Sequence, residues 1–133
     1  MPSAKLIYDP DCGFCRWCLG KVLAWDRRRA LRPVALGSTE ADLLLAEMPA
    51  DRRLASWHLV DGDGGLHSAG AAFAPLFRML PAGAPLAAAA ERLPSAVDRG
   101  YRWVAANRSR FGRLVTAGAK HRADRRIAER LRT

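Results

Sequence analysis

The sequence predicts an α/β fold in a single domain. Short runs rich in leucine, β-branched and aromatic residues alternate with longer stretches in which apolar residues recur every three or four positions. A length of 133 residues fits one domain, and 50% of the residues are hydrophobic, so an ordinary buried core is expected. Glycine and proline residues punctuate these segments and set their order.

The first predicted elements are a strand and an amphipathic helix. Residues 4–8 read Ala-Lys-Leu-Ile-Tyr, a strand-like run bounded by an Asp-Pro pair. Beyond this pair, apolar residues recur at spacings of four and three, which defines one face of a helix. The residues of that face are Phe14, Cys18, Val22 and Trp25. Polar residues at positions 26–29 end the helix.

The second predicted strand covers residues 31–36. Pro33 has no backbone N–H, which favours an edge strand or an early strand position. The helix between the first two strands makes a crossover, so these strands should be parallel. Ser38 or Thr39 can cap the next helix, which is expected over residues 41–47.

A hairpin and a helix follow. Residues 55–60 are expected to form the third strand, residues 61–65 a glycine-rich turn, and residues 66–67 a short antiparallel fourth strand. Ser68 is expected to cap a helix over residues 69–80. This β-α-β then β-β-α order predicts a mixed sheet of about four strands, flanked by helices.

Helices dominate the remainder of the chain. They are expected over residues 86–93, over residues 95–107 with Ser95 as the cap, and over residues 120–132 as a basic helix or frayed tail. We therefore divide the domain into a core over residues 1–80 and a C-terminal helical extension over residues 81–133 that packs on the same domain.

Two cysteines lie where the first strand meets the first helix. Cys12 is expected at or near the first helical turn, where unpaired backbone N–H groups and the helix dipole stabilise the reactive thiolate. Cys15 lies about one turn further on the same side, so it can attack a mixed disulfide on Cys12 and release the partner thiol. A strand, a Cys-x-x-Cys pair and a helix in this order are typical of a thioredoxin-like redox site.

Residues 9–15 read Asp-Pro-Asp-Cys-Gly-Phe-Cys. This run resembles the Asp-x-x-Cys-x-x-Cys signature of the DCC family of thiol-disulfide oxidoreductases. The resemblance covers about residues 4–113, including the segments 101–108 and 111–113, and the last twenty residues look like a private extension. It implies a thioredoxin-like fold and a catalytic cysteine. Two departures stand out: no proline lies near Ala55, where thioredoxins place a cis-proline, and no cysteine follows residues 111–113 as in many family members.

The aspartates beside the cysteines have two interpretations. Asp9 is either a proton acceptor for Cys15 during resolution or an N-cap, and the family signature favours the first. For Asp11 the cap is favoured. Arg16 would favour the Cys12 thiolate, whereas both carboxylates would oppose it.

A third cysteine allows a metal-site interpretation. Cys18 extends the motif to Cys-x-x-Cys-x-x-Cys, and three thiolates with one histidine make a zinc or iron–sulfur site. The histidines available to complete it are His58, His67 and His121. A fourth cysteine is missing and Cys18 lies on the apolar helix face, so core packing is favoured and no metal or other cofactor is predicted.

The net charge of +9 is concentrated in the last quarter of the chain. Residues 1–98 hold equal numbers of basic and acidic residues, whereas residues 99–133 hold eleven Lys and Arg against Asp124 and Glu129. An alternative function is therefore a non-enzymatic module that binds an anionic partner. Nucleic acid is not favoured, because the aromatic residues of this part look like core positions. They are Tyr101, Trp103 and Phe111.

The sequence as a whole predicts a cytoplasmic thiol-disulfide oxidoreductase. Three clustered cysteines suit a reducing compartment, no signal peptide or transmembrane segment is visible, and prolines interrupt the most apolar stretch, residues 69–90. Its partner would be a protein or small-molecule disulfide or thiol. Two sulfurs carry the electrons, so the reaction needs no cofactor.

Overall fold

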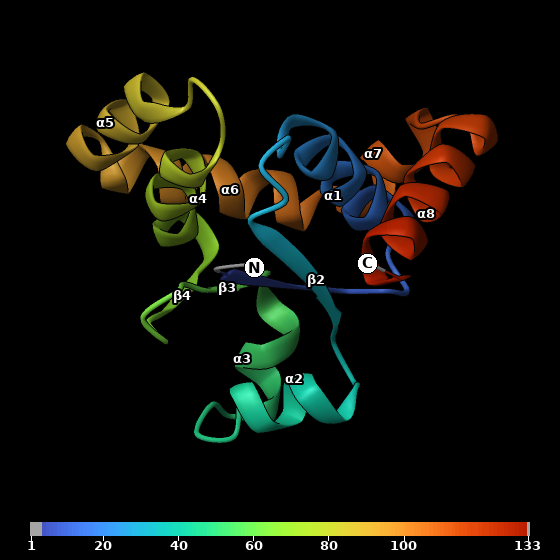
Figure 1. The fold of residues 1–133 in the computed structure, drawn as a ribbon, viewed down its shortest axis with the longest axis horizontal. Coiled ribbons are helices and arrows are strands. Elements are labelled where there is room, and N and C mark those ends of the chain that lie inside the picture. Colours follow the sequence, from blue (N-terminus) through green and yellow to red (C-terminus); the bar gives the residue numbers. More distant parts are fainter. Residues whose placement is uncertain (1–3, 133) are drawn as a thin grey trace.

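A four-stranded mixed sheet forms the centre of the computed structural model, which describes residues 4–132 (Figure 1). The strand order is β2-β1-β3-β4, with β1 at Ala4–Tyr8, β2 at Leu31–Ala35, β3 at His58–Val60 and β4 at Leu66–Ser68. β1 runs parallel to β2 and antiparallel to β3, and β3 runs antiparallel to β4. The predicted α/β thioredoxin-like class is confirmed, as are the parallel first pair and the edge position of the strand that contains Pro33.

Helices cover both faces of this sheet (Figure 1). α1 (Gly13–Trp25) connects β1 to β2, and α2 (Thr39–Leu44) and α3 (Ala50–Ala55) lie between β2 and β3 in the chain. After β4 come the 3₁₀ helix η1 (Ala69–Ala72), α4 (Phe73–Met79), α5 (Ala84–Arg92), α6 (Pro94–Ala106), α7 (Arg108–Leu114) and α8 (Ala117–Arg132). α2 and α3 lie below the sheet in this view, and α1 and α4–α8 lie above it. Within residues 4–132, no helix has the combination of length and hydropathy that crossing a membrane requires.

The alternation of side chains along β1 divides the core in two. Successive strand residues point to opposite faces of a sheet. Leu6 belongs to the larger core, on the side of α1, α4 and α8, whereas Ile7 belongs to the smaller core beside α2. Both side chains are 1% exposed. The smaller core is completed by Val34, Ala41 and Leu45.

The last helix packs along the first. At Gly20 of α1, an added Cβ would stand 2.8 Å from the Cβ of Ala123 in α8, so glycine permits this close approach. Near the far end, Arg130 donates hydrogen bonds to the carboxylate of Asp26 (2.7 Å) and to the backbone oxygens of Leu31 (3.0 Å) and Leu23 (3.2 Å). One guanidinium thereby connects α8 to the end of α1 and the start of β2.

The region between β2 and β3 differs from the prediction. The helix expected over residues 41–47 ends at Leu44, and α3 was not predicted. Ala, Arg and Leu favour helix, and α3 extends as far as Ala55. The strand expected over residues 55–60 is therefore shorter and covers only His58–Val60. The Ser38 cap is confirmed, since its hydroxyl accepts the N–H of Ala41 at 3.2 Å.

Two other predicted caps form no side-chain capping bond. Ser68 is the N-cap residue of the 3₁₀ helix η1, which precedes α4, but its hydroxyl bonds to the His58 ring at 2.7 Å. Ser95 lies inside α6, which begins at Pro94, because proline suits the first helical position. The basic C-terminal segment is a continuous helix that already begins at Ala117.

Candidate functional site

A tight turn joins β1 to α1 and places the first cysteine at the helix N-terminus. Cys12 is the N-cap residue of α1, and its sulfur accepts the N–H of Cys15 at 3.2 Å. Asp9 shapes the turn, because its carbonyl accepts the N–H of Cys12 (3.3 Å) and its carboxylate accepts the N–H of Asp11 (2.9 Å). The predicted Asp11 cap is therefore wrong, since the Cys12 sulfur takes that place.

The two sulfurs lie side by side. The Cys15 thiol donates to the Cys12 sulfur across 2.6 Å, and both cysteines are free and partly buried. Burial raises the pKa of Cys15 to about 12, and the hydrogen bond to Cys12 adds to this effect. At neutral pH the Cys15 thiol thus keeps its proton and presents it to the Cys12 sulfur.

A charged pair lies next to the thiols. The Arg108 guanidinium, at the start of α7, lies 3.6 Å from the Asp9 carboxylate, whose side chain is 22% exposed. Arg108 opposes the rise in the pKa of Cys15, which burial causes. Sequence reasoning gave Arg108 no role, although it belongs to the family-like segment 101–108. Arg16, which was expected to act on Cys12, instead donates to Asp124 (2.9 Å) and to the Pro10 carbonyl (2.6 Å).

Tyr101 ties α6 to the segment that precedes β3. Its hydroxyl oxygen accepts the N–H of Trp57 at 2.9 Å, and the two rings stack with centroids 5.9 Å apart. Burial raises the pKa of Tyr101 to about 12, so the phenol is neutral. Trp103 was expected in the core with Tyr101 but is 62% exposed, because it lies on the outer face of α6.

An apolar cavity of about 670 Å³ lies beside Cys15. β1, α1, α4, α5 and α6 all contribute to its walls. The predicted apolar face of the first helix provides three of the lining residues, Phe14, Cys18 and Val22, and the buried Leu19 of α1 also lines the cavity. Burial raises the pKa of Cys18 to about 11, so this thiol is also protonated at neutral pH.

Comparison with known families agrees with this arrangement. The model of the DCC1-like thiol-disulfide oxidoreductase family matches residues 6–114. The chain belongs to this family. The match includes the cysteine turn, the sheet and α7, and it ends before α8. Comparison with curated proteins found no match, and neither did comparison with solved structures.

Two of the three histidines of this DCC1-like family member, His58 and His67, bond to groups other than the cysteines. His58 is 1% exposed and bonds to the Ser68 hydroxyl (2.7 Å) and the Arg53 carbonyl (3.0 Å). His67 bonds to the Asp61 carboxylate at 2.8 Å. Across residues 4–132, no three His, Cys, Asp or Glu side chains are grouped so that they could hold a metal ion. The alternative of a metal site at the three cysteines gains no support.

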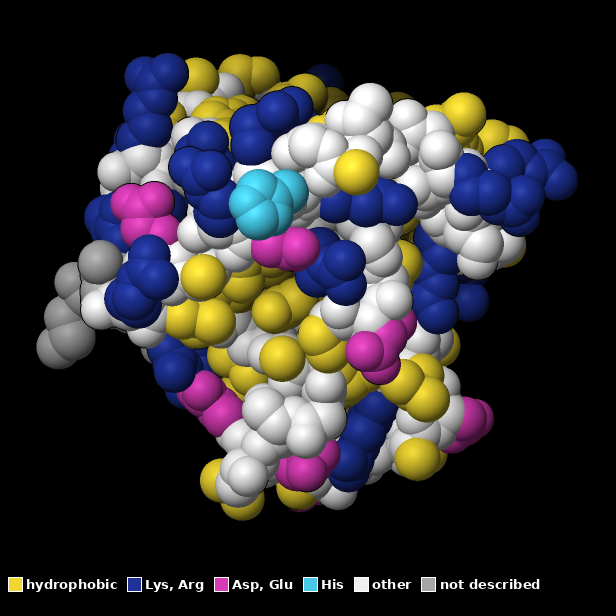
Figure 2. Space-filling model, turned by 90° about the vertical axis from the view of Figure 1, so that its right-hand side faces the viewer, with side chains coloured by type: hydrophobic (Ala, Val, Ile, Leu, Met, Phe, Trp, Pro, Cys, Tyr) yellow, Lys and Arg dark blue, Asp and Glu magenta, His cyan; other side chains and the backbone are white. Residues whose placement is uncertain are grey.

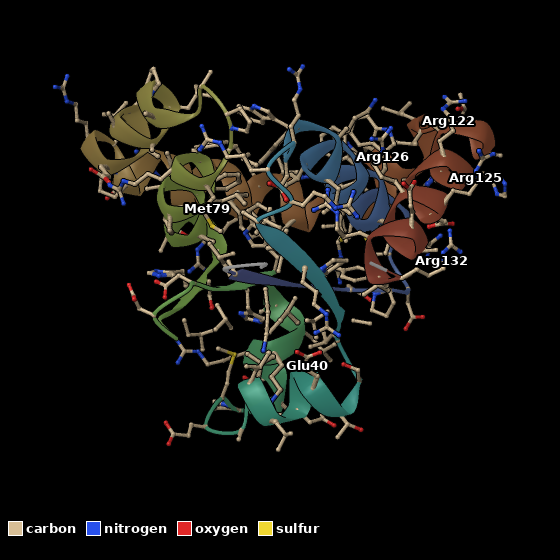
Figure 3. The ribbon with its side chains drawn as sticks, in the orientation of Figure 1. Glu40, Met79, Arg122, Arg125, Arg126 and Arg132 are labelled. Atoms are coloured by element: carbon tan, nitrogen blue, oxygen red, sulfur yellow. The ribbon has the colours of Figure 1, made fainter. Side chains whose placement is uncertain are left out.

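The helix beyond the family match carries a basic surface. Figure 2 shows Lys and Arg side chains gathered over the upper part of the face on which α8 lies, around a histidine and with a few carboxylates among them. Arg122, Arg125 and Arg132 extend outward from α8 (Figure 3). Asp124 is paired with Arg16 of α1 through the bond described above, so its carboxylate offsets the charge of Arg16 and not that of these arginines.

Proposed function

We propose that the protein exchanges thiols and disulfides, with Cys12 as the nucleophile and Cys15 as the resolving thiol. The observation that carries this proposal is the pairing of the two sulfurs at 2.6 Å, with Cys12 at the N-cap of α1. The helix N-terminus and two hydrogen bonds, from the Cys15 thiol and its backbone N–H, all favour negative charge on the Cys12 sulfur. Cys15 itself stays protonated until it is needed.

The reaction has two steps. The Cys12 thiolate attacks one sulfur of a substrate disulfide, forms a Cys12–substrate disulfide and releases the first substrate thiolate, which takes up a proton. Cys15 then loses its proton and attacks the Cys12 sulfur, which forms the Cys12–Cys15 disulfide and releases the second substrate thiolate. The protein dithiol is oxidised by two electrons and the substrate disulfide is reduced to two thiols. The two sulfurs carry these electrons without a cofactor.

Asp9 is the proposed proton acceptor for Cys15. Its carboxylate lines the same cavity as Cys15, and the nearby Arg108 guanidinium holds it in place. A buried thiol with a pKa of about 12 needs such a base, because its spontaneous thiolate fraction at pH 7 is very small. The enzyme would work in the cytoplasm, where a reducing pool keeps the clustered cysteines as thiols.

Three matched serine variants test the assignment. Reduced wild type, Cys12→Ser, Cys15→Ser and Cys18→Ser are mixed with bis(2-hydroxyethyl) disulfide, and thiol release and protein mass are followed. Cys12→Ser should lose exchange, and Cys15→Ser should accumulate a mixed disulfide at Cys12. Cys18→Ser is the control, since this thiol lies on the same helix but outside the pair, and it should retain exchange. Normal exchange by Cys12→Ser would refute the proposal.

A second candidate function is binding of an anionic partner through α8. It is favoured by the exposed arginines of this helix, Arg122, Arg125, Arg126 and Arg132. Retention on a heparin column should then fall steeply with salt, fall again when these arginines are replaced by glutamine, and be unchanged by loss of Cys12 and Cys15. Retention that the glutamine variant does not reduce would exclude this function.

A further inference from the structure

We propose that the cavity beside Cys15 binds the apolar body of a small, neutral disulfide, so that substrate choice depends on hydrocarbon length. This inference rests on the proposed function and assigns a substrate class to it. The lining is almost entirely hydrocarbon and aromatic, and Trp57, Phe73 and Phe77 contribute rings to it. A volume of about 670 Å³ lies within the usual range for small-molecule sites, roughly 300–1,000 Å³.

The cavity is open to molecules from solution. Three leucines in its lining are unusually exposed for large apolar side chains: Leu54 at 61%, Leu86 at 48% and Leu93 at 60%. They come from α3 and from the α5 region, so two separate parts of the chain contribute exposed apolar side chains to the lining. Apolar side chains that stay exposed around a cavity are typical of a binding site, since an occupant would remove them from water.

The cavity borders the proposed pair of reacting cysteines. Cys15 and Cys18 both belong to its lining, and the Cys12 sulfur lies 2.6 Å from that of Cys15. An occupant whose S–S bond lies at the Cys15 end is therefore within reach of Cys12. The hydrocarbon arm would extend away from the thiols, between α1 and α6.

The charges in the lining favour a neutral occupant. Among the described lining residues, only Asp9 and Arg108 carry full charges, and they offset each other across 3.6 Å. An anionic substrate would meet the Asp9 carboxylate and the Cys12 thiolate, and a cationic substrate would have to leave water for a hydrocarbon wall. A neutral disulfide avoids both costs.

The bound disulfide would react in the same two steps as described for the proposed function. Cys12 attacks the S–S bond of the bound disulfide, the first thiol leaves, and Cys15 displaces the second thiol by forming the Cys12–Cys15 bond. The reduced protein supplies both electrons in a single turnover, so no further reductant is involved in the measured step.

The test compares two disulfides of nearly equal intrinsic reactivity. Reduced wild type is mixed with bis(2-hydroxyethyl) disulfide or bis(6-hydroxyhexyl) disulfide, which differ by four methylene groups per arm, and the single-turnover rates are measured. Each buried methylene favours binding, so the longer disulfide should react about tenfold faster or more at low concentration. Equal rates in wild type would overturn the inference.

Position 100 provides a matched pair of variants. Gly100 lines the cavity, and an added Cβ would meet nothing within 4 Å. Gly100→Leu fills part of the cavity, whereas Gly100→Ala brings a similar gain in helix propensity without filling it. Leu should reduce the preference for the hexyl disulfide to about twofold or less, and Ala should keep the wild-type preference. A full preference in Gly100→Leu would contradict the assignment of this cavity.

The surface variant Leu93→Asp gives an independent check, because this side chain is already 60% exposed and its replacement spares the core. It should also weaken the preference for the longer arm, and an undiminished preference would count against the site. In every variant the rate with the hydroxyethyl disulfide is measured in parallel, and the preference is the ratio of the two rates. If wild type reduces neither disulfide, the proposed exchange activity fails; if it reduces both equally, only the substrate class fails.

Discussion

Cys12 and Cys15 have different surroundings although only two residues separate them. Cys12 lies at the end of the helix, where it accepts two hydrogen bonds, whereas Cys15 lies inside the first turn against the apolar cavity. Burial is the main cause of the raised pKa of Cys15, Asp9 adds to it and Arg108 opposes it. The proposed division of roles between the two sulfurs rests on these positions, and in that proposal the second step requires removal of the Cys15 proton.

Replacing the Asp9 carboxylate distinguishes proton transfer by Asp9 from an effect of its charge alone. If Asp9 accepts the Cys15 proton, Asp9→Asn should slow resolution by about 100-fold or more and leave the attack by Cys12 unchanged. If Asp9 acts only through its charge, its removal should lower the pKa of Cys15 and speed resolution. Quenched-flow mass spectrometry of the mixed disulfide distinguishes the two. Asp11→Asn, which alters the neighbouring exposed carboxylate, is the control and should behave like wild type.

His58 should make stability depend on pH. Burial lowers its pKa below 6.5, against the opposing effect of its bond to the Arg53 carbonyl. Near pH 6.5 the unfolded chain binds a proton at His58 more readily than the folded chain does. The contribution of neutral His58 to the free energy of unfolding is therefore present above that pH, and it is lost as the pH falls toward the lower native pKa. Urea unfolding at pH 7.5 and pH 5.5 should reveal the loss in wild type. In His58→Gln the difference should be smaller, and an unchanged difference would assign it to another group.

At the residue scale, the sequence alone could single out Cys12, Cys15 and Asp9 as candidates because their spacing is local. It could not find the contact between Asp9 and Arg108, since nothing in a single sequence indicates that α7 returns to the cysteine turn. The same holds for Arg16, whose nearest charge in the chain is not its partner: it reaches Asp124 on α8 instead.

At the scale of helices and strands, Arg130 forms a buried polar connection between α8 and the rest of the fold. Its side chain is 10% exposed and that of Asp26 is 0% exposed. Removing one member of a buried ion pair leaves the other charge without compensation, which costs about 3–5 kcal/mol. Arg130→Met should therefore lower the free energy of unfolding by about that amount.

Urea unfolding of Arg130→Met and of Arg126→Met measures this cost. Arg126 is an exposed residue of the same helix, so its replacement should change stability by less than about 0.5 kcal/mol. A loss of under about 1 kcal/mol in Arg130→Met would mean that the pair contributes little to the attachment of α8.

Long elements with clear periodicity were predictable, and short ones with competing signals were not. The strands β1 and β2 and the helix α1 lie close to their expected positions, because burial on both sheet faces and a four-and-three spacing leave strong patterns. α3 was missed because it spans six residues and runs into a β-like segment. The predicted cap at Ser68 failed because its hydroxyl bonds to His58 instead, and the one at Ser95 failed because α6 begins one residue earlier, at Pro94.

At the scale of the molecule, the division into a core over residues 1–80 and a helical extension over residues 81–133 stays a prediction. It describes two stretches of one domain and does not imply that they fold separately. α8 packs on α1, and Ile127 joins the larger core with Leu6 and Leu23. Without residues 81–133 this core would face water on one side. The chain should therefore unfold in a single cooperative transition, and residues 1–80 alone should lack one.

Two spectroscopic probes check this expectation. Far-UV circular dichroism follows all helices, whereas tryptophan fluorescence follows mainly Trp17, Trp25 and Trp57, which lie in the first 80 residues. The two urea curves of the full chain should coincide. Separate midpoints, or a cooperative transition in the isolated 1–80 chain, would show that the extension is an independent unit.

The edges of the sheet restrict how another protein can be held. One edge strand, β2, contains Pro33, which has no N–H to donate, and α8 contacts it; the other, β4, has three residues. Joining a foreign segment to a sheet as an extra strand requires a row of free main-chain donors and acceptors. A polypeptide partner would therefore be recognised through side chains near the thiols, and its selection would depend on their chemistry more than on an extended backbone.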